Sequence, residues 1–312
     1  MTFTQWLYPD LKDYFDSLSN FSPTLDKMIA TREMIHYGAQ NLNLQDVRVE
    51  EHYVKTRDGF QNRVLVCRPA KVHAKGRAML WFHGGGMVIG NPDNSVGYVL
   101  DFVRQCNAVV VIPTYRLAPE FPYPYAFHDC YDSLLWLSEN AELLNINRSN
   151  IATAGASAGG NLCIAVNLFA RDHHGPKVAF QCPLYPMLDY RNSFPSNEIS
   201  YPKVWNREKN ELAWQYYLQQ LNGNIPYTAS PILCDDWRNS PPTYTFIGTC
   251  DLFRDETMYF VQELTKANVP TEFHLYNGGT HGFEMIPNIP FAQHAKKQFI
   301  QTVNSYYERY GI

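Results

Sequence analysis

The stretch Gly155-Ala156-Ser157-Ala158-Gly159 decides the fold, because its G-x-S-x-G pattern stands between a predicted strand and a predicted helix. Residues 150–154 are short, apolar and partly β-branched, as a buried strand requires, and residues 160–171 have the apolar periodicity of a helix. The glycines remove side chains that would collide in so sharp a turn, which leaves the serine hydroxyl exposed. The first N–H groups of the helix then point to where an oxyanion would form. Alone, the pattern also fits a small-residue turn that packs a helix against a sheet.

The composition describes an ordinary globular protein that can bury a substantial core. The chain has 312 residues, of which 45% are hydrophobic and 18% are charged, and its formal net charge is −4. It contains no long run of either charge sign, so we expect no nucleic-acid partner and no polybasic membrane anchor. No apolar stretch approaches the roughly 20 residues that a membrane span needs. We therefore expect no membrane partner either.

The cysteines indicate where the protein works. The seven cysteines are scattered, without a C-x-x-C motif or a Cys/His spacing typical of zinc. An odd number without a disulfide framework predicts reduced thiols and a cytoplasmic location. The first residues also lack the basic and apolar regions of a signal peptide. We predict no metal site.

Strand and helix patterns alternate over most of the chain. A hairpin is predicted from 47–54 and 61–68, which flank the turn residues Arg57-Asp58-Gly59. Further strands are predicted at 78–82, 108–112, 177–185, 243–248 and 271–276, and helices at 94–105, 126–139, 255–267 and 291–307. This alternation predicts an α/β fold, with a mostly parallel sheet covered by helices on both faces.

Two segments stand outside the alternation. Residues 1–45 have apolar residues at helical spacing, interrupted by Ser22-Pro23, and residues 190–230 are polar and aromatic with a helix predicted at 207–220. Each could cover a site, or the N-terminal segment could simply be an added helical layer. We name them the cap segments.

A glycine-rich loop follows the strand predicted at 78–82. His83-Gly84-Gly85-Gly86 would let backbone N–H groups point at a bound anion without obstruction by side chains. The alternative is a merely flexible loop. In either case we expect His83 to be structural rather than catalytic.

A nucleophilic serine needs a base, and the base needs an acid that orients it. Asp251 and His281 each follow a predicted strand, where an elbow serine would point, and the order Ser157, Asp251, His281 is that of an α/β-hydrolase. Asp255 and Glu256 are rival acids, but we expect them to be first-turn charges of a helix. His274 is a rival base, but it lies within a predicted strand.

Several motifs together resemble the hormone-sensitive lipase family of esterases. They are His83–Gly86, Tyr115–Glu120, Gly155–Asn161, Asp251–Glu256 and His281–Phe283, and the resemblance runs from about residue 47 to the C-terminus. It implies a single α/β-hydrolase domain over residues 1–312, with about eight strands and a helical cap. The cap segments, at about 1–45 and 190–230, fit the two pieces of that cap.

The resemblance also implies roles. Ser157 would be the nucleophile, His281 the general acid and base, and Asp251 its orienting acid. The backbone N–H groups of Gly84, Gly85 and Ala158 would form the oxyanion hole, which His83 would brace. The implied activity is that of a serine carboxylesterase on short- to medium-chain esters, through an acyl-enzyme and without a cofactor.

Other functions share these residues. An amide-type hydrolase, such as an arylformamidase or small deacetylase, would use the same fold and triad. A non-catalytic ligand-binding homologue is a further alternative, although such plant receptors have lost the histidine that is present here as His281. An interfacial lipase lacks support, since we see no amphipathic anchor.

The chain departs from the family at two positions. Thr114 stands where an aspartate is usual, so its hydroxyl would have to order the following loop, and Ala156 replaces the frequent elbow aspartate. Pocket walls are expected at Met87 and Val88 after the glycines, and at Tyr190, Tyr201 and Trp205 in the second cap segment. Family members often pair through the last strand and helix, which suggests a homodimer.

Overall fold

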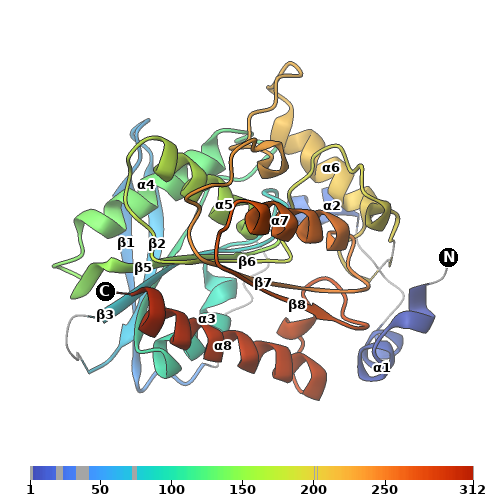
Figure 1. Ribbon diagram of the computed structural model, residues 1–312, viewed down its shortest axis with the longest axis horizontal. Helices are drawn as coiled ribbons and strands as arrows, with labels where there is room; N and C mark the ends of the chain where they lie inside the picture. Colours follow the sequence, from blue (N-terminus) through green and yellow to red (C-terminus); the bar gives the residue numbers. More distant parts are fainter. Residues whose placement is uncertain are drawn as a thin grey trace.

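The computed structural model describes residues 3–18, 24–32, 42–71, 76–199, 201 and 203–311. Its centre is an eight-stranded sheet of order β1-β2-β4-β3-β5-β6-β7-β8 (Figure 1). The strands are β1 (Val47–Lys55), β2 (Gln61–Pro69), β3 (Gly76–Phe82), β4 (Ala108–Pro113), β5 (Ile146–Ala156), β6 (Gln181–Leu184), β7 (Thr243–Gly248) and β8 (Thr271–Tyr276). β1–β2 and β2–β4 pair antiparallel and the other pairs are parallel. The predicted mostly parallel sheet is confirmed.

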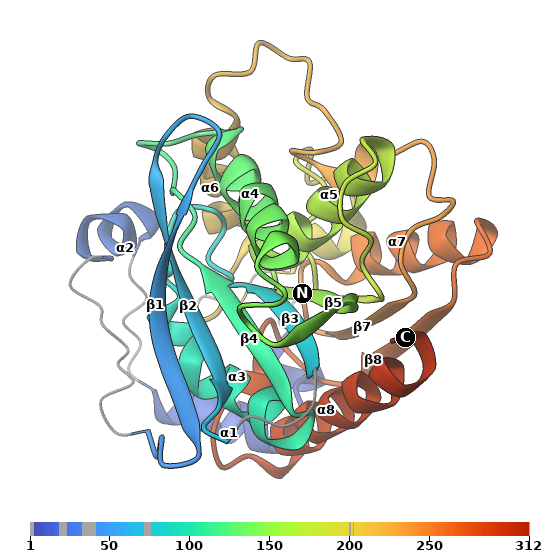
Figure 2. The ribbon, with the colours of Figure 1, turned by 90° about the vertical axis from the view of Figure 1, so that its left-hand side faces the viewer.

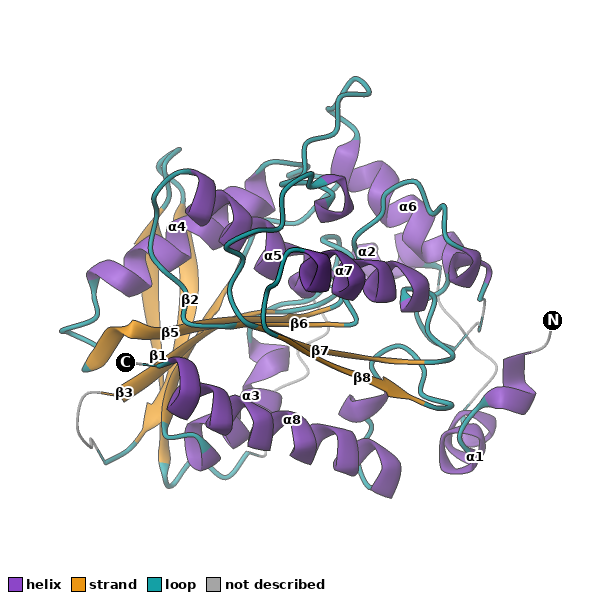
Figure 3. Cartoon of the chain, viewed as in Figure 1, coloured by secondary structure: helices purple, strands orange, loops and turns teal. Residues whose placement is uncertain are grey.

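Helices cover both faces of this sheet (Figures 2 and 3). α3 (Asp93–Gln105) and α8 (Pro290–Tyr310) lie on one face, and α4 (Tyr125–Glu139), α5 (Ala158–Asp172) and α7 (Arg254–Lys266) on the other. Every residue of β4 and β7 is buried. A strand covered on both faces is mostly apolar, which is why β4 (Ala-Val-Val-Val-Ile-Pro) is an unbroken hydrophobic run, whereas β7 also buries Thr243 and Thr245.

The cap segments contribute α1 (Pro9–Ser17), α2 (Leu25–Thr31) and α6 (Arg207–Leu218), on the right-hand side of Figure 1. Leu11 and Phe15 of α1 are buried, as their helical spacing predicted. The two segments contact each other, because Tyr216 Oη donates to Asp26 Oδ1 at 2.6 Å. The predicted break at Ser22-Pro23 lies outside the described residues.

Some predicted boundaries were wrong. The strand expected at 177–185 is only β6, although the N–H of Ala179 still donates to the carbonyl of Ile151 at 2.8 Å. Val178 and Ala179 are buried without belonging to a regular ladder, so their apolar character came from the core rather than from a strand. β5 begins at Ile146, earlier than expected, because polar residues form its first half.

Candidate active site

Ser157 lies at the turn between β5 and α5. Its backbone has φ 60° and ψ −117°, a conformation that non-glycine residues rarely adopt. The neighbouring strand β6 and the loop after it hold the residue in place, since the Ser157 N–H donates to the carbonyl of Leu184 at 3.0 Å and its carbonyl accepts from Met187 at 3.1 Å. These backbone bonds stabilise the strained elbow.

The glycines around Ser157 allow backbone to pack directly on backbone. A Cβ at Gly159 would lie 2.0 Å from the carbonyl oxygen of Phe82, and one at Gly155 would lie 2.3 Å from that of Gly159. No side chain fits at either distance. The elbow therefore presses against the end of β3, which carries the glycine-rich loop.

Three predicted side chains meet here. His281 Nε2 is 2.9 Å from Ser157 Oγ, and His281 Nδ1 is 2.9 Å from Asp251 Oδ2. The Asp251 carboxylate is fully buried, and its Oδ1 accepts the N–H of Phe253 at 2.9 Å. An acceptor at Nδ1 keeps the proton there and leaves Nε2 free to take a proton from the serine.

The loops that carry Asp251 and His281 follow adjacent parallel strands and pack closely on each other. A Cβ at Gly248 would lie 2.0 Å from the carbonyl oxygen of Gly279. That carbonyl also accepts the N–H of Cys250 at 2.9 Å. The spacing between the acid and the histidine is thus set by backbone contact.

The rival groups have other partners. Asp255 Oδ2 accepts the N–H of Ser196 at 2.9 Å, and His274 Nε2 is 2.9 Å from Glu272 in β8. Asp255 and Glu256 both lie in the first turn of α7, as expected, and Glu256 makes further contacts that sequence reasoning did not indicate. It is fully buried and accepts the N–H groups of Leu188 at 2.9 Å and Asp189 at 3.2 Å. Its place four residues before the buried Phe260 was the available signal.

The glycine-rich loop lies beside the serine. A Cβ at Gly84 would be 3.5 Å from Ser157 Cβ, and Gly85 has φ +116°, with room for no side chain because Ile89 O would be 2.2 Å away. The N–H groups of Gly84, Gly85 and Ala158 have no hydrogen-bond acceptor among the described residues. Their part as an oxyanion hole stays a prediction.

His83 holds this loop from behind. Its Nδ1 donates to the carbonyl of Gly84 at 2.8 Å, and its ring stacks on Tyr115 with centroids 4.1 Å apart. Tyr115 Oη also donates to the carbonyl of His83 at 2.7 Å. Burial lowers the pKa of His83 to about 4, so the ring is neutral at physiological pH. These contacts agree with the structural part expected for His83.

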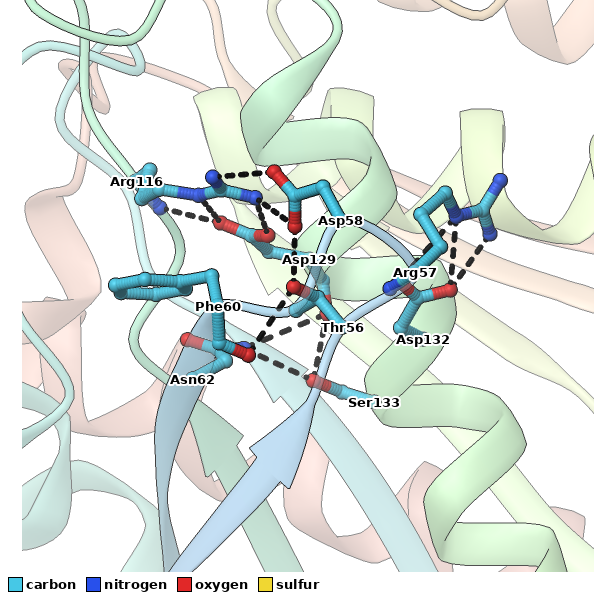
Figure 4. A network of polar contacts seen from close by, with 9 residues as sticks. All are labelled: Thr56, Arg57, Asp58, Phe60, Asn62, Arg116, Asp129, Asp132 and Ser133. Carbon is cyan, nitrogen blue, oxygen red and sulfur yellow. Dashed lines mark hydrogen bonds and ion pairs between the residues drawn. The ribbon is translucent and has the colours of Figure 1, made fainter.

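The loop after β4 is ordered differently from the expectation. Thr114 Oγ1 is buried and has no hydrogen-bond partner among the described residues, so its hydroxyl does not replace the usual aspartate. Arg116 orders the loop instead (Figure 4). Its guanidinium binds Asp129 of α4 at 2.6 Å and Asp58 of the β1–β2 turn at 2.7 Å. Sequence reasoning interpreted Asp58 only as a turn residue and missed this pair.

The cap segments contact the glycine-rich loop. A Cβ at Gly86 would lie 2.5 Å from Trp205 Cη2, so the indole lies directly on this glycine. Trp205 Nε1 donates to Asn210 Oδ1 at 3.1 Å. Arg32, which sequence reasoning missed, donates through Nη1 to the carbonyls of Val88 at 2.7 Å and Ala118 at 3.0 Å.

The other expected pocket residues are buried or partly buried. Met87 and Val88 are fully buried behind the loop. Tyr201 packs edge-to-face on Phe15 at 5.3 Å, and the N–H of Tyr190 donates to Ser230 Oγ at 3.3 Å. Their part in substrate binding stays a prediction.

The described ranges hold neither a metal-binding cluster nor a helix suited to a bilayer. Among those residues, no group of three or more histidine, cysteine or acidic side chains is placed to hold a metal ion. No described helix combines the length and the apolar character that crossing a bilayer demands.

The chain is similar to known proteins in sequence and in fold. The α/β-hydrolase fold family matches residues 79–285. The carboxylesterase NlhH of Mycobacterium tuberculosis is 33% identical over 248 residues, which cover 77% of this chain and 76% of that protein. Ethyl acetate hydrolase of Pseudomonas putida is 30% identical over 75% of each chain. The structure of a bacterial heroin esterase superposes with a TM-score of 0.92 at 28% identity, covering 98% of this chain and 99% of that one. The chain therefore belongs to the α/β-hydrolase family, in its hormone-sensitive lipase group.

Proposed function

We propose that this protein is a serine carboxylesterase that hydrolyses short- to medium-chain carboxylic esters. One observation carries the proposal: Ser157, His281 and Asp251 form a continuous hydrogen-bonded relay, with 2.9 Å at each step. Relatives named as a carboxylesterase and an ethyl acetate hydrolase support ester substrates. A non-catalytic ligand-binding protein would not need an intact relay.

In the first half-reaction, Ser157 Oγ attacks the ester carbonyl carbon while His281 Nε2 takes the hydroxyl proton. The carbonyl oxygen becomes an oxyanion, which the N–H groups of Gly84, Gly85 and Ala158 bind. The carbon–oxygen bond to the alcohol then breaks, and His281 gives its proton to the departing alcohol. Asp251 stabilises the imidazolium throughout.

In the second half-reaction, water attacks the acyl-enzyme. His281 takes the proton of the water, the same oxyanion site is used again, and the bond to Ser157 Oγ breaks. The carboxylic acid leaves, and the proton returns from His281 to the serine. The cycle needs no cofactor.

The test is hydrolysis of p-nitrophenyl esters, from acetate to laurate, by the wild type and by Ser157→Ala. We expect turnover that is best on short chains, and a loss of about 10⁴- to 10⁶-fold in kcat in the variant. Folded wild-type protein that hydrolyses no ester would contradict the proposal. Faster cleavage of matched acyl anilides would point to the amide-type alternative.

We also propose that the cap segments cover the site and that Met87, Val88, Tyr190, Tyr201 and Trp205 shape its pocket. The contact of Trp205 with Gly86 supports this, since it lies one residue from the proposed oxyanion donors. Replacing Met87 or Trp205 by alanine should move the preferred acyl length. An unchanged length profile in both variants would exclude these two as pocket walls.

We further propose that the protein forms a homodimer and works in the cytoplasm. β8 is an edge strand with Leu275 43% exposed, which supports pairing of two copies through β8 and α8. All seven cysteines are free, as suits a reducing cytoplasm. Light scattering after size-exclusion chromatography would distinguish a dimer from a monomer.

A further inference from the structure

A second buried carboxyl group lies behind the relay. Glu284, in the short helix Phe283–Met285, is fully buried and follows His281 by three residues. Its Oε1 accepts the hydroxyl of Tyr185 at 2.5 Å, and Tyr98 Oη lies 3.5 Å from the same atom. Its Oε2 is buried and has no hydrogen-bond partner among the described residues. Burying a carboxyl group this way is costly, so a purely structural position would favour an apolar residue.

Tyr185 connects this carboxyl group to the histidine. Its ring meets the His281 ring edge-to-face, with centroids 5.0 Å apart and an interplanar angle of 74°. Phe253 makes a similar contact with His281 at 5.1 Å and 82°. Tyr185 itself has φ +33°, and its N–H donates to the carbonyl of Phe246 at 3.0 Å. Tyr185 thus packs against His281 with its ring and binds Glu284 through its hydroxyl.

The titratable groups around Glu284 do not include a cation that would neutralise its carboxylate among the described residues, apart from His281 itself. Tyr185 faces it from the end of β6, Tyr98 from α3, and Asp251 and His281 from the relay. On α8, Lys296 lies 4.8 Å from the centre of the Tyr98 ring, but its charge is paired with Asp101 at 2.6 Å. Burial raises the pKa of Glu284 to about 7, against the opposing effects of the Tyr185 hydrogen bond and His281. The carboxyl group therefore changes charge close to neutral pH.

We propose that Glu284 is a positioning residue for the esterase reaction, holding His281 in orientation through Tyr185 and stabilising its imidazolium by charge. This inference rests on the proposed function. When Ser157 loses its proton to His281, the new positive charge lies near two carboxyl groups. Asp251 binds it directly at Nδ1, whereas Glu284 acts through Tyr185 and by its field.

The proposal is tested with Glu284→Gln, which keeps an acceptor for Tyr185 but cannot carry charge. Tyr185→Phe keeps the ring contact with His281 but removes the hydrogen bond that stabilises the Glu284 carboxylate. Tyr307→Phe is the control, because it removes a buried hydroxyl that donates to the carbonyl of Ala78 at 2.7 Å, away from the relay. The readout is the pH profile of kcat/KM on p-nitrophenyl butyrate, followed at the isosbestic wavelength of the product.

We expect the acidic limb to move by about 0.5 to 1 pH unit toward lower pH in Glu284→Gln. The loss of the charge lowers the proton affinity of His281 and removes one ionisation from the limb. The plateau of kcat should fall about fivefold, with KM nearly unchanged, because the charge acts on the imidazolium rather than on bound ester. Tyr185→Phe should shift the limb in the same direction, and Tyr307→Phe should leave it in place.

The opposite result is also specific. A limb that coincides with that of the wild type in both Glu284→Gln and Tyr185→Phe would overturn the proposal, even if kcat fell, because packing alone would then explain the loss. If Glu284→Gln does not fold, the position of the acidic limb in the pH profile of Tyr185→Phe tests the proposal by itself. Activity that survives Ser157→Ala would instead mean that the proposed function is wrong.

Discussion

Two parts of the molecule meet at the glycine-rich loop and are held in place by different means. The loops that carry Ser157, Asp251 and His281 pack backbone against backbone, so closely that a Cβ at Gly159 or Gly248 would lie 2.0 Å from a carbonyl oxygen. The cap segments are attached by side chains. Arg32 donates to the carbonyl of Val88 at 2.7 Å, and the Trp205 indole lies close against Gly86.

This difference indicates which substitutions each part of the molecule tolerates. Backbone packing leaves no freedom, so the relay distances are set by the sheet and its loops, as catalysis needs. A side-chain anchor can be lost while the backbone beneath it stays in place. We therefore expect changes in the loops that carry Ser157, Asp251 and His281 to affect folding, and changes in the cap segments to affect substrate binding.

The largest effect should come from Gly159→Ala. Its Cβ would overlap the carbonyl of Phe82, so we expect the free energy of unfolding to fall by more than about 3 kcal/mol, or the protein not to fold. Gly223, between α6 and the rest of the second cap segment, is the control. It has φ +85° with nothing within 4 Å of a built Cβ, so Gly223→Ala should cost about 1 kcal/mol from backbone strain alone. If urea denaturation showed equal losses of unfolding free energy for Gly159→Ala and Gly223→Ala, the comparison between the two parts would be contradicted.

The ion pair between Arg116 and Asp129 tests whether side chains contribute as much as backbone packing to stability outside the cap segments. Asp129 is fully buried against Arg116, so Asp129→Asn leaves a buried guanidinium with only Asp58 as a charged partner. We expect a loss of about 3 kcal/mol in urea denaturation. Asp236→Asn, which removes the exposed pair with Arg238, should change nothing measurable. A loss below about 1 kcal/mol for Asp129→Asn would show that the loop is ordered by its backbone instead.

His83 makes the stability of the glycine-rich loop depend on pH. Unfolded His83 takes up a proton below about pH 6.5, whereas the folded, buried ring stays neutral until its pKa of about 4. The unfolded state therefore binds more protons in this window, and stability falls as the pH drops through it. Between pH 7 and pH 5, we expect the free energy of unfolding of His83→Gln to fall by about 2 kcal/mol less than that of the wild type. If urea denaturation showed the same fall in unfolding free energy from pH 7 to pH 5 for the wild type and for His83→Gln, the prediction would be contradicted.

The smallest effect should come from Arg32→Gln. Removing the two hydrogen bonds to Val88 and Ala118 loosens the cap segment over the loop, so we expect KM to rise about fivefold while kcat stays nearly constant. Lys12→Gln, which removes only an exposed pair with Asp16, is the control and should leave KM unchanged. A fall in kcat without a change in KM would mean that Arg32 orders the catalytic loop itself.

Most of the strand–helix order could be predicted, because periodicity and turn chemistry are local. Ser157, Asp251 and His281 could be named because each follows a strand, and the carboxyl ends of parallel strands meet at one edge of the sheet. Buried polar contacts could not be predicted in this way. The Arg116–Asp58 pair joins residues 58 positions apart, and Tyr185 meets Glu284 across 99 positions.

From the amino-acid sequence alone one could read the fold class, the elbow, the order of the relay residues and the glycine-rich loop. These follow from side-chain pattern over a few residues and from the rule that strands of one sheet end together. Only the tertiary structure decided that Glu256 binds a loop, that Arg116 takes over the ordering of the loop after Thr114, and that Glu284 stands behind His281. Each depends on which polar group is deprived of water, and burial is a property of the packed molecule rather than of any local stretch.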